Sequence, residues 1–332
     1  MSGMAAAEGA RAQGSEPKPL VVLIDPKWNF DLKNFEVERF FEEAKVTETS
    51  INVLQQRFNR FCGTGTGAKE EPVLTMESFH RMNEHYSLCK TQEEEHYFRA
   101  MDRKRTQQLC FHDFLVGCSA ANPATPHILN SFTGYVRALF IFDFYNVSGS
   151  GSLDFDELAT LLGDTRRNQE EDAEALSRLV LDVAQELGEV SAVTLRVHGR
   201  SGQLCDFRVS TKWTGRHVRR EIAKRLQVPM EGQELYLGGQ PIREEDVLES
   251  LLPADTAGSV VATLERANWS LWPHSVEPAP SDSTPGIERL AHVAFQRFHQ
   301  ALTTEKLRGT SRLFRFHRQI LHTKTRGAVG GA

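Results

Sequence analysis

A run of twelve residues from Asn146 to Glu157 places oxygen-bearing side chains at alternate positions and ends on a glutamate. This spacing suits Ca²⁺, which takes six or more oxygen ligands from a short loop with glycine at its sixth position and a bidentate carboxylate at its twelfth. Gly151 stands at the sixth position. The predicted ligands are Asn146, Ser148, Ser150, the carbonyl of Ser152, Asp154 and Glu157. The pattern therefore predicts a site for Ca²⁺ as the cofactor of this chain.

Apolar residues on both sides of the loop recur at helical spacing, which predicts one helix entering it and another leaving it. The entering helix contributes Val136, Leu139, Phe140, Phe142 and Tyr145, and the leaving helix contributes Leu158, Leu161 and Leu162. This helix–loop–helix arrangement is that of an EF-hand. Leu153, at the eighth position, is expected to form a short strand with a neighbouring loop.

The charge of the loop predicts weak binding, because calcium affinity rises with the number of charged ligands. Asp154 and Glu157 are the two charged ligands, whereas the first, third and fifth positions carry Asn or Ser. A loop that folds without Ca²⁺ at cellular concentrations is therefore the alternative interpretation.

Two further segments look like damaged copies of the same unit. The segment Asp102 to Asp113 has Lys104 at the third position and Gln107 in place of the glycine, so it is not expected to hold Ca²⁺. An earlier copy has Phe58 and Phe61 before a glycine-rich stretch that starts at Cys62, and the leaving helix carries Phe79 and Met82. The glycines do not indicate a phosphate-binding loop, because the GK[ST] ending is absent and a helix comes before them.

Taken together, residues 35–162 resemble the calcineurin B and neuronal calcium sensor branch of the EF-hand superfamily. The cysteine and glycines of the first copy, the run from Phe111 to Gly117 and the intact third loop carry the resemblance. It implies a hydrophobic groove that grips a helix of a target protein, often a kinase, a phosphatase or a channel. The chain departs from that branch, which usually keeps two or three competent loops.

A fourth unit is expected in two separated pieces. A helix from Asp172 to Leu187, with a capping box from Asn168 and Glu171, has one apolar face but no loop after it. Its apolar face is formed by Leu176, Leu179, Val180, Val183 and Leu187. Much later, a loop end and a leaving helix are suggested by Val293, Phe295, Phe298, Ala301 and Leu302. We therefore expect residues 189–286 to be inserted in the fourth loop.

The inserted segment resembles ubiquitin in the order of its elements. A hairpin (193–197 and 204–209, with its turn at Gly202) is followed by a helix with Val218, Ile222 and Leu226, a strand within 234–242, a short segment 247–252 and a last strand 260–264. This order implies a β-grasp domain. Conjugation is not expected, because the last strand continues into residues 265–268 without a terminal Gly-Gly. The sheet face around Tyr236 and Thr263 is either a partner-binding surface or part of a spacer.

A basic segment, residues 306–332, closes the chain and interleaves positive charges with apolar residues. Its apolar residues are Leu313, Phe314, Phe316, Ile320 and Leu321. Such a segment suits its own domain's groove, an anionic lipid surface, or solvent as a free tail. We favour self-docking in the groove.

The predicted fold class is mainly α, from EF-hand pairs, plus an inserted α+β ubiquitin-like β-grasp domain. The expected divisions are a disordered N-terminus (1–20), an EF-hand domain (21–188), the ubiquitin-like domain (189–268), a linker rich in proline and serine (269–286), the leaving helix of the fourth hand (287–305) and the basic tail (306–332).

The composition excludes several function classes. A net charge of -5 over 332 residues does not indicate nucleic acid as a partner, and no apolar run is long enough for a transmembrane segment. Five cysteines without a CxxC pair suit a reducing compartment, so a cytoplasmic protein is expected. No nucleophile accompanies the histidines, so the chain is not expected to be an enzyme. The expected function is a calcium-binding sensor or adaptor; the alternative is a calcium-independent scaffold with degenerate EF-hands.

Overall fold

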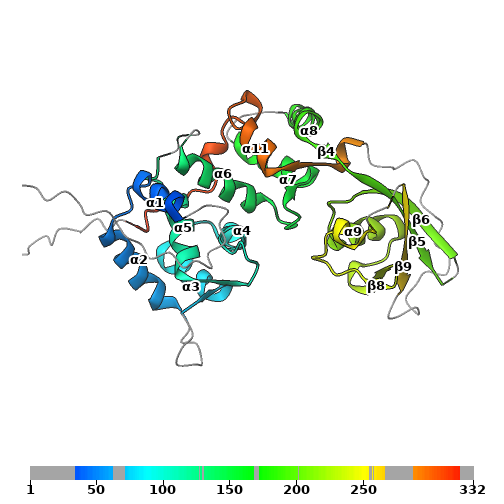
Figure 1. The fold of residues 1–332 in the computed structure, drawn as a ribbon, viewed down its shortest axis with the longest axis horizontal. Coiled ribbons are helices and arrows are strands. Elements are labelled where there is room, and N and C mark those ends of the chain that lie inside the picture. The colour runs from blue at the N-terminus through cyan, green and yellow to red at the C-terminus, as the bar shows by residue number, and fades with distance from the viewer. Residues whose placement is uncertain are drawn as a thin grey trace, which may run out of the picture.

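The computed structural model describes residues 34–62, 72–126, 128, 131–167, 172–200, 202–253, 256, 258–265 and 287–321 (Figure 1). The predicted disordered N-terminus 1–20, the capping box of Asn168 and Glu171, the linker 269–286 and the end of the basic tail lie outside these residues. The described chain is of mixed α and β structure.

Helices joined by loops form the larger lobe, drawn on the left and at the top of Figure 1. Its α-helices are α1 (Asn34–Glu43), α2 (Glu48–Phe61), α3 (Met76–Tyr86), α4 (Glu94–Met101), α5 (Phe111–Ala121), α6 (Phe132–Tyr145), α7 (Phe155–Arg166), α8 (Ala173–Leu187) and α11 (Phe295–Ala301). One continuous hydrophobic core joins all of these helices.

Two short antiparallel strand pairs link the helix–loop–helix units two by two. Strand β1 (Leu74–Thr75) pairs with β2 (Gln108–Leu109), so that Leu74 faces Leu109. Strand β3 (Ser152–Leu153) pairs with β10 (Ala291–Ala294), so that Leu153 faces Val293. The expected strand at Leu153 is thus confirmed, and its partner lies 140 residues further along the chain.

The second lobe is a five-stranded sheet with one long helix packed on it (Figure 1, right). Its elements are β5 (Ala192–Gly199), β6 (Gly202–Ser210), α9 (Gly215–Leu226), β7 (Glu234–Leu237), β8 (Gln240–Pro241), α10 (Leu248–Leu251) and β9 (Ser259–Glu265). The sheet order is β6-β5-β9-β7-β8, and β5 runs parallel to β9. Val218, Ile222 and Leu226 of α9 are buried against the sheet in a core of their own.

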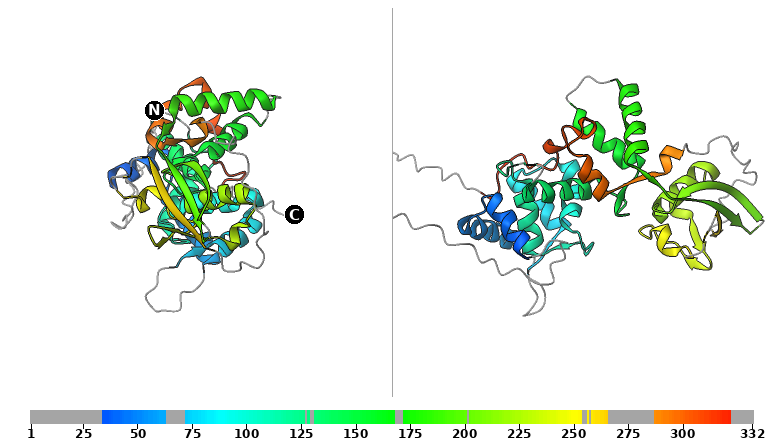
Figure 2. Two further views of the ribbon diagram at one scale, coloured as in Figure 1. Left: turned by 90° about the vertical axis from the view of Figure 1, so that its right-hand side faces the viewer. Right: turned by 45° about the horizontal axis from the view of Figure 1, so that its top comes forward.

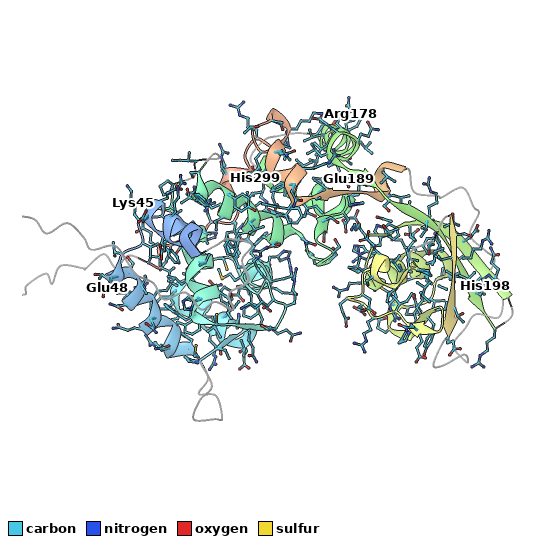
Figure 3. All side chains as sticks on the ribbon, viewed as in Figure 1. Lys45, Glu48, Arg178, Glu189, His198 and His299 are labelled. Carbon is cyan, nitrogen blue, oxygen red and sulfur yellow. The ribbon has the colours of Figure 1, made fainter. Side chains whose placement is uncertain are left out.

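The chain leaves the helical lobe for the sheet lobe, and returns from it, at neighbouring points. Strand β4 (Glu189–Val190), directly after α8, pairs with β10, which begins when the chain returns. Figure 2 shows the same junction from two further directions, and Figure 3 labels Glu189 at this junction and His198 at the far end of the sheet. The segment between these points is therefore an insertion between two paired strands.

Two element predictions need correction. The helical segment expected over 287–305 is a 3-10 turn (Ile287–Leu290), a strand (β10) and then the shorter helix α11. Backbone pairing with β3 and β4 on both edges outweighs the helical spacing of the apolar residues there. Helix α8 begins at Ala173, because the side chain of Asp172 accepts a hydrogen bond from the backbone N–H of Glu174 and caps the helix.

The insertion predicts that the helical lobe folds without the sheet lobe. We expect a chain in which residues 191–286 are replaced by a six-residue Gly-Ser linker to keep its helical circular dichroism and a cooperative unfolding transition. Val190 pairs with Ala291, which comes four residues after Ile287. A linker of about six residues is therefore long enough to join Val190 to Ile287. Loss of the cooperative transition in the shortened chain would contradict the two-lobe description.

An ion pair between α3 and the start of α4 predicts a pH effect on stability. His80 Nδ1 lies 2.6 Å from Oε2 of the buried Glu94, and this hydrogen bond and charge raise the pKa of His80. A raised folded-state pKa stabilises the fold fully below the unfolded pKa of about 6.5, and this contribution is lost as pH rises through the folded value. We therefore expect His80→Gln to lower the unfolding free energy at pH 5.5 and to have less effect at pH 8.5. Urea denaturation at both pH values measures this, and an equal effect at both would count against it.

None of the helices in the described residues combines the length and apolar composition needed to cross a bilayer.

Candidate metal centre

The loop between α6 and α7 has the backbone that its sequence predicts. Helix α6 ends at Tyr145, and α7 begins at Phe155 after Asp154 as its N-cap. Gly149 and Gly151 have φ values of 70° and 77°, in the left-handed region. A Cβ added at Gly151 would meet no atom within 4 Å, so the backbone conformation, and not space, favours glycine there.

Four of the predicted ligands bring their oxygen atoms together on the inner side of the loop. Ser148 Oγ lies 3.3 Å from Asn146 Oδ1 and 3.2 Å from Ser150 Oγ. Ser150 Oγ donates to the carbonyl of Ser152 at 2.7 Å. These hydrogen bonds between potential ligands hold an oxygen-lined turn together.

Glu157 closes the loop from the first turn of α7. Its carboxylate is nearly buried; Oε1 accepts from the N–H of Ser148 at 2.7 Å and Oε2 from the N–H of Asp154 at 3.0 Å. Burial first, and then the charge of Asp154, raise the pKa of Glu157 to about 7. A buried carboxylate held at this position is stabilised by a nearby positive charge.

Asp154, at the ninth position, has two different oxygen environments. Oδ1 accepts from the N–H of Glu157 at 2.9 Å and caps α7. Oδ2 is buried and accepts no hydrogen bond of good geometry, but it lies 2.8 Å from Nε2 of His217. Burial opposes ionisation of Asp154, yet the contact with His217 and the N–H groups of Glu157 and Asp156 outweigh it and lower its pKa.

These residues fit Ca²⁺ as a ligand set. The loop offers neutral and charged oxygen atoms, with no sulfur or imidazole from its own twelve residues, and hard cations prefer oxygen ligands. Oδ2 of Asp154 is buried without a hydrogen bond of good geometry, and Asp154 lines a cavity together with Ser148 and Glu157 of the loop. Asn146, Ser148, Ser150, Ser152, Asp154 and Glu157 would hold the ion, which when bound supplies a positive charge that neutralises the two carboxylates.

Strand pairing places the other three loops in register with this one. Leu74, Leu109, Leu153 and Val293 face one another in the two strand pairs and so mark the eighth position of each loop. The twelfth positions, four residues later, hold Ser78, Asp113, Glu157 and Arg297. Within these four described loop ends, Glu157 alone supplies the long bidentate carboxylate. Arg297 is positively charged and instead forms an ion pair with Glu189 at 3.0 Å.

The loop that begins at Asp102 is held together by internal hydrogen bonds. Asp102 Oδ1 accepts from the N–H of Thr106 at 3.0 Å, and Oδ2 accepts from the N–H of Gln107 at 2.6 Å. Gln107 takes the left-handed φ of 59° that glycine would adopt. The first-position carboxylate thus accepts hydrogen bonds from within its own loop.

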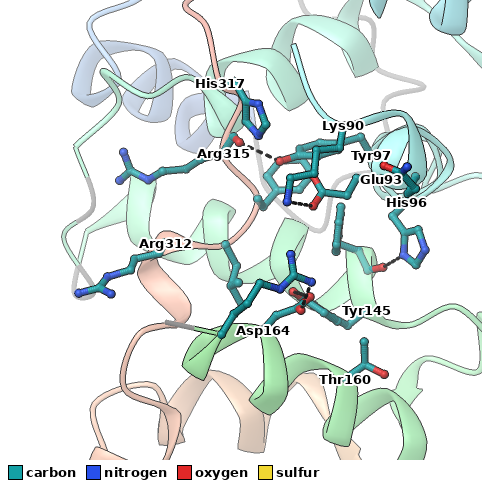
Figure 4. A pocket seen from close by; sticks show the side chains of 15 residues that line it. Lys90, Glu93, His96, Tyr97, Tyr145, Thr160, Asp164, Arg312, Arg315 and His317 are labelled. Atoms are coloured by element: carbon teal, nitrogen blue, oxygen red, sulfur yellow. Dashed lines mark hydrogen bonds and ion pairs between the residues drawn. The ribbon is translucent and has the colours of Figure 1, made fainter. Parts of the chain in front are cut away.

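Residues of the basic segment lie in the core between the helix pairs. The Phe314 ring stacks on Phe140 of α6 with centroids 5.0 Å apart, and it also contacts Tyr97 of α4 and Phe144 of α6. Phe316, Ile320 and Leu321 are buried as well. Figure 4 shows the cavity of about 540 Å³ that remains between α4, α7 and residues 312–317, with the Tyr97 hydroxyl bound to the carbonyl of Arg315.

Backbone hydrogen bonds fix this segment along its length. The N–H of Phe316 donates to the carbonyl of Ala121 at 2.8 Å, and the N–H of His317 donates to that of Leu88 at 2.6 Å. Arg137 of α6, fully buried, donates to the carbonyls of Leu313 and Ala120. Burial and the charge of Arg315 lower the pKa of Arg137 to about 9.

Three functional features were missed from the sequence. They are His217 beside Asp154, Arg297 at the twelfth position of the split loop, and Arg137 as the binding group for residues 311–313. Arg297 could have been found from the sequence, because Val293 at the eighth position places residue 297 at the twelfth. The other two depend on contacts between distant segments that no local spacing encodes.

Among the described residues, no group of three or more His, Cys, Asp or Glu side chains lies close enough to share a metal ion. The five cysteines are all free, and none of them belongs to the loop from Asn146 to Glu157. A comparison with models of known protein families gives no match to this chain, and a sequence comparison with curated proteins gives none either.

Proposed function

We propose that this chain is a calcium-responsive EF-hand adaptor that binds a target protein and carries a non-conjugated ubiquitin-like domain. In this proposal two EF-hand pairs form the helical lobe, and a β-grasp domain is inserted in the fourth loop. The strand pairings Leu74 with Leu109 and Leu153 with Val293 support the first point. The sheet order and the packing of α9 support the second.

One observation carries the calcium part of the proposal: both oxygens of the buried Glu157 face back into the loop, on the N–H groups of Ser148 and Asp154. A bidentate glutamate at the twelfth position is the strongest ligand of such a loop. Two charged ligands among six place the expected dissociation constant in the weaker range, roughly 10⁻⁵ to 10⁻³ M.

The place of the target is the groove that residues 313–321 now fill. A target helix with large apolar residues at helical spacing would have to displace Phe314 and Phe316 from the rings of Tyr97 and Phe144. We therefore propose that the basic segment is an intramolecular competitor of the target. Kinases, phosphatases and channels remain the target classes that the family resemblance implies.

A second function, a calcium-independent scaffold in the cytoplasm, is favoured by the internally satisfied loop at Asp102. A pull-down with the full chain distinguishes the two. A sensor retains its partners in Ca²⁺ and releases them in chelator, and the Glu157→Gln bait does not retain them in Ca²⁺. A scaffold retains the same partners in all three conditions, and that result would refute the sensor function.

A further inference from the structure

The inserted domain contacts the candidate calcium loop through the first turns of α9. Arg216, His217 and Arg220 line one side of a cavity of about 220 Å³. Asp154, Asp156 and Glu157 are among the residues on its other side. In Figure 1, α9 is the helix of the right-hand lobe that faces the end of α6 and the start of α7. A domain that interrupts the fourth loop thus reaches the third.

His217 is fixed in the orientation that this contact requires. The N–H of Thr214 donates to Nδ1 of His217 at 3.2 Å, within the capping box of α9. Because a backbone N–H can only donate, Nδ1 is an acceptor and the ring proton is on Nε2. The Trp213 ring stacks on the imidazole, with an angle of 28° between the planes. Nε2 therefore faces away from its own helix, toward Asp154.

The atom that His217 contacts is the carboxylate oxygen of a predicted calcium ligand that does not cap α7. Asp154 Oδ1 is occupied as the N-cap of α7, so Oδ2 is the oxygen left for the ninth position of the loop. His217 Nε2 lies 2.8 Å from this Oδ2, and both side chains are no more than 15% exposed. While Oδ2 accepts a hydrogen bond from the imidazole N–H, it binds an ion, or a water molecule of that ion, less strongly.

The neighbours of His217 act in the same direction. Arg216 and Arg220 bring two positive charges to the cavity mouth, and Glu244, at 3.4 Å from Arg216, offsets part of one of them. Positive charges at the mouth of the loop oppose the approach of a divalent cation. The docked domain therefore disfavours the ion by charge as well as by contact.

We propose that docking of α9 on the loop and binding of a divalent cation in the loop are mutually antagonistic, with the contact between His217 and Asp154 as the coupling element. This inference rests on the proposed calcium function. Coupling between two binding events is reciprocal, so removal of His217 strengthens cation binding and the cation releases the domain. The surface that cation binding exposes in this way is the face of α9 that carries Arg216, His217 and Arg220.

Calorimetric titration of the full chain with Ca²⁺ tests the first half of this statement. His217→Ala is expected to bind Ca²⁺ about fivefold more tightly than the unmodified chain, at the lower end of ordinary coupling strengths. His198→Ala, in β5 at the far end of the sheet of the same lobe, is the matched control, and its calcium affinity is expected to equal that of the unmodified chain (Figure 3). Circular dichroism checks that both variants keep the fold.

Small-angle X-ray scattering tests the second half without relying on the affinity. His217→Glu keeps a side chain that can accept the Thr214 N–H in the capping box and places a negative charge against Asp154. Measured in chelator, this variant is expected to have a larger radius of gyration than the unmodified chain, as the unmodified chain does when Ca²⁺ is added.

The outcomes separate the two proposals. Equal calcium affinity of the unmodified chain and His217→Ala, or equal radii for His217→Glu and the unmodified chain in chelator, overturns the antagonism and leaves the calcium function in place. Calcium binding by His217→Ala but not by the unmodified chain supports the antagonism in its strongest form. An absence of binding by both chains overturns both proposals.

Discussion

Phe314→Ala is expected to lower the free energy of unfolding of the helical lobe by about 3 to 5 kcal/mol, the usual cost of removing a fully packed phenylalanine. Phe314 is 3% exposed and its ring contacts Tyr97, Phe140 and Phe144, which belong to two different helix–loop–helix units. The substitution therefore opens a cavity where the helix pairs meet. Urea denaturation followed by circular dichroism measures the change.

The same variant reports on the groove. If residues 313–321 cover apolar surface that a target would otherwise bind, Phe314→Ala increases the binding of a hydrophobic dye, and a chain truncated after Glu305 increases it further. Arg318→Ala, an exposed position in the same segment, is the control and is expected to change neither quantity. A Phe314→Ala chain as stable as the control would show that this segment is not part of the core.

Glu157→Gln is expected to remove measurable calcium binding up to millimolar Ca²⁺. The substitution replaces a charged bidentate ligand with a neutral amide, and Asp154 is then the single charged residue among the predicted ligands. The fold is expected to persist, because glutamine can still accept the N–H of Asp154 in the capping box of α7. Isothermal titration calorimetry on the full chain measures the effect.

Asp113→Asn provides the matched control at the twelfth position of the preceding unit. Asp113 accepts from the N–H of Cys110 and caps α5, as Glu157 does for α7, but its loop is closed by Asp102. Calcium binding by Asp113→Asn is expected to equal that of the unmodified chain. Loss of binding in this control, or retained binding in Glu157→Gln, would place the ion elsewhere.

The parts of the fold that follow from local chemistry could be predicted from the sequence. Ligand spacing and the glycine at the sixth position predicted the loop from Asn146 to Glu157; alternation of apolar residues predicted β5 and β6, and the helical spacing of Val218, Ile222 and Leu226 predicted α9. The split unit was predicted from the apolar residues of its two separated pieces, and the structure pairs Val293 of the second piece with Leu153.

The parts that depend on distant contacts could not be predicted. Residues 291–294 read as helix by spacing, and only two partner strands at once make them β10. The contact of His217 with Asp154 depends on how the inserted lobe turns after β4, which no pattern within either segment determines. Burial of Arg137 likewise depends on backbone carbonyls that arrive from residues 311–313.

The stoichiometry of calcium binding to the full chain tests the central claim most directly. Titration calorimetry is expected to give one site per chain, with a dissociation constant of roughly 10⁻⁵ to 10⁻³ M. Four helix–loop–helix units with one bidentate glutamate at a twelfth position lead to this single site. No heat at millimolar Ca²⁺, or two or more sites per chain, would contradict it.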